Sequence, residues 1–260
     1  MQLDLYQIDA FTNEVFSGNP ACVVPLKEWL SDEILMKIAQ ENGVPETAFF
    51  IMNDTIKLRW FTPDIEMDLC GHATLATAHV LKTILNYPND KIIFQTISGE
   101  LSVTQNNGIY MLDFPSREPI PAQLPEAILK SLNIHPVDVL KSRDYLLIYE
   151  SETDIINITI DRQYFDTVNL GTGGVIVTAK GNECDFVSRF FTPCATILED
   201  PVTGSAHCSL IPYWSKILGK KSMTAKQLSQ RGGFLYCENK NDRVMIGGNA
   251  KTYCKGKICV

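Results

Sequence analysis

Arg59-Trp60-Phe61-Thr62-Pro63 returns in the second half of the chain as Arg189-Phe190-Phe191-Thr192-Pro193. The second copy lies 130 positions after the first (189 − 59), which is half of the 260-residue length. Three further matches follow in the same order at offsets of 133 and 134: Gly71-His72-Ala73 with Gly204-Ser205-Ala206, 98–101 with 232–235, and 110–112 with 244–246. A repeat of this length is the size of a whole domain, so the sequence predicts two similar domains.

The domain boundary is expected in a proline-rich stretch near the middle of the chain. Pro115, Pro119, Pro121 and Pro125 crowd this stretch, and proline both removes a backbone donor and stiffens a connection. We therefore expect an N-terminal domain over 1–117 and a C-terminal domain over 118–260, with terminal strands that can cross into the partner domain.

Alternation of apolar and polar residues predicts that both halves consist mostly of strands. Ser31, followed by Asp32 and Glu33, is typical of a helix start, and that helix should end at Gly43. The expected strands are 3–5, 21–24, 48–51, 56–60, 91–96 and 109–114 in the first half and 145–149, 155–160, 175–179 and 186–191 in the second.

One further helix in each half has small or apolar residues on nearly every side. The first begins at Ala73 and carries no charge until Lys82, and the second begins at Ala206 and carries none until Lys216. Helices without a polar face are usually buried all round. The sequence thus predicts an α+β fold of two pseudo-symmetric domains, each a curled or barrel-like sheet around a central buried helix.

Composition and charge exclude several classes of protein. The chain is 45% hydrophobic and carries a net charge of −7, without a basic run or a long apolar segment. These values are typical of a globular protein and unfavourable for binding nucleic acid or crossing a membrane. The N-terminal residues lack the basic start and apolar core of a signal peptide, so a cytoplasmic protein with a small-molecule substrate is expected.

The eight cysteines and four histidines show no spacing typical of a metal site. No cysteine pair is separated by two residues, and no histidine pair by three. We expect neither a metal nor disulfides, because thiols in a cytoplasmic protein stay reduced.

Each buried helix is preceded by a loop that places a glycine at the helix start, Gly71 in the first half and Gly204 in the second. Free backbone N–H groups at a helix start bind carboxylate or phosphate groups. In a duplicated protein the two starts can face each other across the domain interface, so a pocket for an anionic metabolite is predicted there. For one such loop alone, a tight turn would be the simpler interpretation.

Three segments resemble the phenazine-biosynthesis PhzF-like isomerase family, which shares the diaminopimelate epimerase fold. They are Gly18-Asn19-Pro20-Ala21, 68–74 and 199–207, and the resemblance extends over almost the whole chain. It implies two pseudo-symmetric domains, no cofactor, no metal and a possible homodimer. It also implies acid–base proton movement on a small carboxylate-bearing substrate.

The resemblance further implies the residues of the site. The acid–base glutamate falls on Glu46, and the polar residues around the substrate fall on His72, Asp200 and Ser205. The backbone at Gly71–Ala73 and at Gly204–Ala206 would bind the substrate's anionic group. The predicted substrate-binding residues therefore also include Gly71, Ala73 and Gly204. Without the resemblance, Glu46 would be interpreted as an ordinary carboxylate at a strand end; burial at that position would suit proton transfer near neutral pH.

Two alternatives remain open. Relatives that racemise amino acids use two opposed thiols, and Cys70 fits the first of these positions, whereas the matching position in the second half is assigned to Asp200. A lone thiol cannot perform that reaction, so Cys70 is interpreted as a packed bystander. The other alternative is a non-catalytic protein that binds carboxylates in the same pocket.

Overall fold

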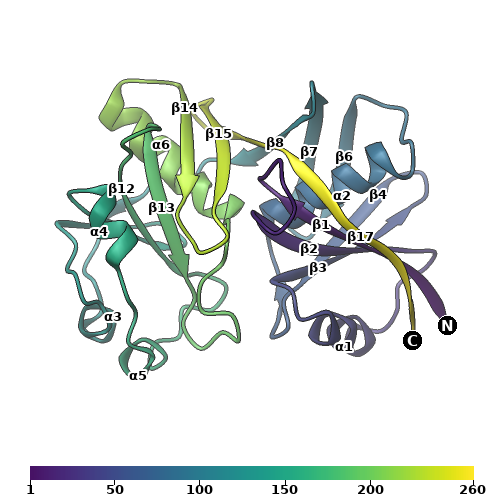
Figure 1. Cartoon of the computed structure of the whole chain (residues 1–260), viewed down its shortest axis with the longest axis horizontal. Helices are drawn as coiled ribbons and strands as arrows, with labels where there is room; N and C mark the ends of the chain where they lie inside the picture. The colour runs from purple at the N-terminus through teal and green to yellow at the C-terminus, as the bar shows by residue number, and fades with distance from the viewer. The chain divides into compact units, whose positions relative to one another are not determined.

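The computed structural model describes residues 1–260 and divides the chain into two compact units (Figure 1). Unit 1 comprises Met1–Phe114 together with Ile246–Val260, and unit 2 comprises Pro115–Met245. The end of the chain therefore belongs to the same unit as its beginning. The expected boundary at 117/118 lies three residues from the observed one, and the terminal strand crosses over into the first unit.

Unit 1 is built from a curled sheet whose strands pair in an order different from their order along the chain. Strand β1 lies between β17 and β2, and the sheet continues through β3, β4, β6, β7 and β8. The bounds are β1 Gln2–Ala10, β2 Asn19–Leu26, β3 Glu46–Met52, β4 Ile56–Phe61, β5 Glu66–Met67, β6 Lys91–Thr96, β7 Gly99–Asn106, β8 Ile109–Pro115 and β17 Ala250–Cys259.

Unit 2 repeats this pairing pattern. In unit 1 the pairs β2–β3 and β4–β6 are parallel and the pairs β3–β4 and β6–β7 antiparallel. In unit 2 the pairs β11–β12 and β13–β14 are parallel and the pairs β12–β13 and β14–β15 antiparallel. The bounds are β9 Ile120–Pro121, β10 Asp138–Lys141, β11 Tyr145–Ile148, β12 Val175–Lys180, β13 Phe186–Phe191, β14 Ser222–Gln227 and β15 Gly233–Asn239. Strand β16 (Arg243–Gly248) begins in unit 2 and ends in unit 1. The duplication that the sequence predicts is therefore present in the fold.

A buried helix packs against each sheet, as the all-round apolar sequences predict. In unit 1, α2 (Gly71–Thr83) is buried at every position from Gly71 to Leu81 and contacts β1, β2, β3 and β17. In unit 2, the short 3₁₀ turn η1 (Gly204–Ala206) leads into α6 (His207–Leu218), which contains Pro212. The predicted fold class is confirmed.

The repeated Arg-x-Phe-Thr-Pro motif makes the same contacts in both units. Arg59 forms two hydrogen bonds of 2.7 Å to the carboxylate of Glu66, and its guanidinium lies 5.0 Å from the Phe61 ring. Arg189 bonds the carboxylate of Glu199 at 2.7 and 2.9 Å, and lies 4.9 Å from the Phe191 ring. Such bidentate pairs are geometrically specific, which explains why both copies keep the motif.

One strand prediction is wrong, and the others are confirmed with shifts of at most two residues at their ends, except that 3–5 extends to Gln2–Ala10. The strands β5, β7, β9, β10 and β14 to β17 were not predicted. Residues 155–160 do not form a strand, because Glu152–Asn157 form helix α4. Ser151 accepts a bond from the Asp154 N–H and Asp154 accepts one from the Ser151 N–H, a reciprocal cap that stabilises a helix start. The predicted helix capped by Ser31 is α1 (Asp32–Asn42), and Gly43 ends it with φ of +61°. The remaining helices are α3 (Glu126–Ser131) and α5 (Arg162–Phe165).

Candidate active site

Glu46 is the first residue of β3, and its side chain lies inside unit 1. It stands opposite Ala21 on the parallel neighbour β2, and the residue is only 8% exposed. A carboxylate that is removed from water in this way requires a partner, because an unpaired buried charge is strongly destabilising. The structure supplies that partner from the start of α2.

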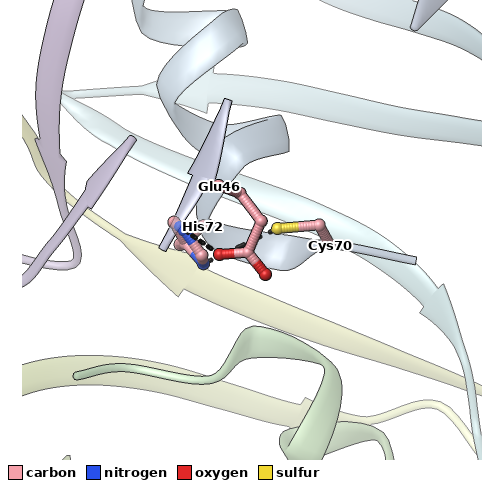
Figure 2. Close-up of side chains that lie close together, drawn as sticks. All are labelled: Glu46, Cys70 and His72. Atoms are coloured by element: carbon pink, nitrogen blue, oxygen red, sulfur yellow. Dashed lines mark hydrogen bonds and ion pairs between the residues drawn. The ribbon is translucent and has the colours of Figure 1, made fainter. Parts of the chain in front are cut away.

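His72, in the first turn of α2, is the partner of Glu46 (Figure 2). The distance from His72 Nε2 to Glu46 Oε2 is 3.0 Å. Cys70, the residue that precedes α2, approaches the other ring nitrogen: its Sγ lies 3.6 Å from His72 Nδ1. Figure 2 shows the three side chains pointing toward one another. The structure thus brings the predicted residues Glu46 and His72 together, and it adds Cys70.

A fourth side chain, Asn19, reaches the same histidine from β2. Asn19 is completely buried, and its Nδ2 lies 3.0 Å from His72 Nδ1. Gly18 has φ of +67°, and a Cβ at that position would lie 2.2 Å from the Ala10 carbonyl oxygen. Only glycine is compatible with this turn, which delivers Asn19 to the histidine.

The titration of this cluster follows from its burial. Burial raises the pKa of the Cys70 thiol to about 11, and the nearby Glu46 carboxylate adds to the effect. Burial lowers the pKa of His72, but Cys70 and Glu46 raise it, and together they hold it well above its ordinary value. At neutral pH Cys70 is therefore a thiol, and a thiol is a poor nucleophile or base.

Glu46, Cys70 and His72 each offer one possible metal ligand, and these atoms lie within 4.8 Å of one another. The arrangement is nevertheless that of an ion-pair contact on one side of the imidazole and hydrogen bonds on the other. Glu46 approaches Nε2 of the imidazole, whereas Cys70 and Asn19 approach Nδ1. An imidazole binds a metal ion through one nitrogen, so one ion could not take all three residues without a rearrangement of these contacts.

In unit 2 the corresponding helix start is held by side chains that sequence reasoning did not identify. Thr203 precedes η1 as Cys70 precedes α2, so Thr203 and not Asp200 is the counterpart of Cys70. Thr203 Oγ1 donates to Asp200 Oδ2 at 2.5 Å. Gln227, 1% exposed, accepts from the Thr203 N–H at 2.8 Å and donates to the Asp200 carbonyl at 2.7 Å. The predicted residue Asp200 therefore lies in a turn held by hydrogen bonds from Thr203 and Gln227.

Ser205, the predicted counterpart of His72, contacts an ion pair. Its Oγ accepts a hydrogen bond of 3.0 Å from Arg143 Nη2, and Arg143 also bonds Asp144, which is completely buried. Asp144 in turn accepts from the Gly174 N–H at 2.9 Å. Gly204 and Ala206 complete η1, and both are buried.

The two units differ at the position that Glu46 occupies in unit 1. Thr47 pairs with Phe61, and Val175 pairs with Phe191, the equivalent residue of the repeated motif. Glu46 precedes Thr47, and Gly174 precedes Val175. The position of Glu46 in unit 1 is therefore occupied by a glycine in unit 2. Duplication has given two similar frameworks, but only one of them carries a carboxylate at this point.

Comparison with known proteins agrees with this architecture. A family model described as phenazine biosynthesis-like protein matches residues 8–256. Two uncharacterized isomerases of Pseudomonas aeruginosa are each 46% identical, with 99% of both chains covered. The human phenazine biosynthesis-like domain-containing protein is 38% identical over 99% of both chains.

Solved structures show the same fold. A PhzF family protein of Enterococcus faecalis is 44% identical, with a TM-score of 0.93 and complete coverage of both chains. A hydroxyproline epimerase of Agrobacterium vitis has a TM-score of 0.61 at 8% identity, over 99% of this chain and 92% of the other. This second likeness concerns the fold alone.

Proposed function

The chain belongs to the phenazine biosynthesis-like (PhzF) family, and we propose that it is an isomerase that moves a proton without a cofactor, with Glu46 as the acid–base group. The observation that carries this proposal is the buried pair of Glu46 and His72, 3.0 Å apart at the start of α2. The names of the relatives support isomerase chemistry, because the two proteins from Pseudomonas aeruginosa are called isomerases.

The proposed reaction needs one group that both accepts and returns a proton. Glu46 takes a proton from one carbon or heteroatom of the substrate, and the bonding electrons remain in the substrate. Glu46 then delivers the proton to a second atom, so the substrate is rearranged and the enzyme regains its initial state. Burial of Glu46 favours this transfer because little water is present to exchange the proton.

We propose that the substrate is a small metabolite with a carboxylate. The backbone N–H groups at Gly71–Ala73 are the expected ligands of that group, with His72 as a hydrogen-bond donor. Asp200, Gly204 and Ser205 of unit 2 are proposed to bind polar groups of the substrate. A homodimer and a cytoplasmic location stay predictions; none of the helices in the structure is long and apolar enough to cross a membrane.

Deuterium exchange tests the proposal directly. Small carboxylic acids are first screened by thermal shift, since a ligand at 100 times its Kd adds about 2.7 kcal/mol of stability. Compounds that bind are then incubated with the enzyme in D₂O, and deuterium incorporation is measured by mass spectrometry. Glu46→Gln should reduce incorporation by about 10²- to 10⁴-fold while ligand binding persists.

Glu28→Gln is a matched control, because Glu28 is an exposed glutamate of the same unit. That variant should exchange at the rate of the unmodified enzyme. Undiminished exchange in Glu46→Gln would remove Glu46 from the mechanism. Binding of carboxylates by the unmodified enzyme without any exchange would favour a non-catalytic binding protein.

A second candidate function is a two-base amino-acid racemase that uses Cys70. The contact between Cys70 Sγ and His72 Nδ1 favours it, since a histidine can activate a thiol. The asymmetry of the units weighs against it, because Thr203 occupies the position that corresponds to Cys70. Racemisation of free amino acids, followed by polarimetry, would support this candidate over the first.

A further inference from the structure

Thr203, the residue that precedes η1, has each of its polar groups engaged by a neighbouring side chain. Its N–H donates to Gln227 Oε1 at 2.8 Å, and its carbonyl oxygen lies 2.9 Å from His207 Nδ1. Its Oγ1 contacts two partners, Gln227 Nε2 at 3.2 Å and Asp200 Oδ2 at 2.5 Å. Both Thr203 and Gln227 are buried, so water competes little for these bonds.

The backbone of Thr203 fixes the direction of these hydrogen bonds. A backbone N–H only donates, so the atom of Gln227 that faces it is the amide oxygen, and Nε2 faces Thr203 Oγ1 and the Asp200 carbonyl. An amide nitrogen also only donates, so Thr203 Oγ1 accepts from Nε2. The single proton of the Thr203 hydroxyl is then directed to Asp200 Oδ2, which accepts it.

The fold alone does not require this chain of hydrogen bonds. In the turn before α2 of unit 1, Met67 and Cys70 occupy the positions of Asp200 and Thr203, each 133 residues earlier (200 − 67 and 203 − 70). A thioether and a thiol cannot form the strong bond between a hydroxyl and a carboxylate, yet this turn also leads into a buried helix. The contact between Thr203 and Asp200 is therefore an addition specific to unit 2.

We infer that Thr203 and Gln227 are positioning residues that hold Asp200 as an oriented hydrogen-bond acceptor for the substrate. Gln227 orients the Thr203 hydroxyl, and the hydroxyl proton engages Asp200 Oδ2 and fixes the orientation of the carboxyl group. A carboxylate only accepts, so a substrate group that meets Asp200 must donate a hydrogen bond, as a hydroxyl or ammonium group does. This role rests on the proposed function, whereas the direction of the bonds does not.

The direction of the bonds can be observed without any substrate by ¹H NMR of protein labelled at threonine. The Thr203 hydroxyl proton should resonate downfield and exchange slowly with water, because it is buried and donates to a carboxylate at 2.5 Å. Thr203→Val identifies this signal by its loss. Gln227→Leu removes the donor that orients the hydroxyl, and exchange of the proton should become faster. A Thr203 hydroxyl proton that exchanges rapidly in the unmodified protein would overturn the inference.

Thr203→Val and Thr203→Ser are the matched variants for the effect on the reaction, measured by deuterium exchange into a carboxylic acid identified in the thermal-shift screen. Valine keeps the shape of threonine without the hydroxyl. Thr203→Val should therefore raise KM about 10- to 100-fold, the range for a lost hydrogen bond to a charged group, with kcat changed far less. Thr203→Ser keeps the hydroxyl and should restore the KM of the unmodified enzyme.

Asp200→Ala tests whether Thr203 acts through Asp200. In that background Thr203→Val should change KM by no more than about threefold, because both substitutions remove the same contact. Independent, multiplying effects of the two substitutions on KM would show that Thr203 serves only the structure of the turn, and would overturn the positioning role. If the hydroxyl proton behaves as inferred but Glu46→Gln exchanges normally, the proposed function fails and the contact with Asp200 stands.

Discussion

Glu46 Oε2 and His72 Nε2 lie 3.0 Å apart, and the side chains are only 11% and 2% exposed. The two residues come from different elements, the first residue of β3 and the first turn of α2. Their contact joins the sheet of unit 1 to its buried helix at one end. A carboxylate in this setting is held by the framework of the fold, which is a requirement for proton transfer with defined geometry.

Replacement of Cys70 separates the two candidate reactions. Cys70→Ser should keep activity within about tenfold, or roughly 1.4 kcal/mol of activation free energy, because burial raises the pKa of Cys70 to about 11 and the neutral thiol is a poor base. Steady-state kinetics on an identified substrate measures the change. Complete loss of activity in Cys70→Ser, with normal folding, would instead favour a racemase that needs the thiol.

Gln227 should contribute strongly to the stability of unit 2. Gln227→Leu removes a buried amide that bonds Thr203 N, Thr203 Oγ1 and the Asp200 carbonyl. Unsatisfied buried groups cost about 1 to 3 kcal/mol each, so the free energy of unfolding should fall by about 2 to 4 kcal/mol. Urea denaturation measures this change, with Gln227→Glu as the variant that keeps the acceptor for Thr203 N. A loss below about 0.5 kcal/mol in Gln227→Leu would show that the turn is held by other contacts.

Two buried histidines should make the fold sensitive to acid. Burial lowers the pKa of both His79 and His207 from 6.5 to about 4. In the unfolded chain each binds a proton near pH 6.5, so the unfolded state binds more protons between pH 6.5 and 4. The stability that neutral His79 and His207 contribute is thus complete above pH 6.5 and is lost as the pH falls toward 4, by at most about 3 kcal/mol each.

Unfolding free energies measured between pH 4 and 7.5 test this dependence. His79 lies in unit 1, where its ring nitrogens contact Tyr110 Oη and Thr252 Oγ1, and His207 lies in unit 2 with Nδ1 against the Thr203 carbonyl. His79→Gln and His207→Gln should each be less stable at pH 7 but should lose less stability on acidification. His135, which is exposed, gives the control: His135→Gln should leave the slope unchanged.

Chelation should leave the enzyme unaffected. Because Glu46 and Cys70 approach different nitrogens of His72, we expect the cluster to act through hydrogen bonds. Dialysis against a chelator should therefore change neither deuterium exchange nor thermal stability. Loss of exchange on chelation, restored by a divalent cation, would identify these residues as metal ligands.

The sequence predicts the fold well because its main signals are local. Alternating strands and two helices without charge in their first two turns are visible without tertiary information, and the Arg59 motif reveals the duplication. Several elements were not predicted, among them β7 and the strands β14 to β17. Helix α4 was predicted as a strand because its isoleucines resemble one, and the cap between Ser151 and Asp154 decides the conformation. A capping signal of four residues is easily missed beside an apolar pattern.

The site is harder to predict from the sequence than the fold is, because its residues are distant in the chain and only the fold brings them together. Glu46 and His72 were predicted through a family resemblance, and the structure places Glu46 Oε2 3.0 Å from His72 Nε2. Asn19 belonged to a motif that the sequence analysis identified, but its contact with His72 depends on the turn at Gly18. Gln227 gave no signal at all, since a polar residue at the end of a strand is usually exposed, and only the structure shows it buried.

The division of unit 1 between both ends of the chain has a consequence for biosynthesis. β1 pairs with β17 from Gln2 to Ala10, but Pro115–Met245 must be translated between them. At typical rates of protein synthesis this interval lasts roughly ten seconds. Unit 2 is continuous and can fold on the ribosome first, whereas β1 keeps an unpaired edge until β17 has been synthesised. Newborn chains should therefore be most vulnerable to aggregation and to chaperone capture at their N-terminal strand.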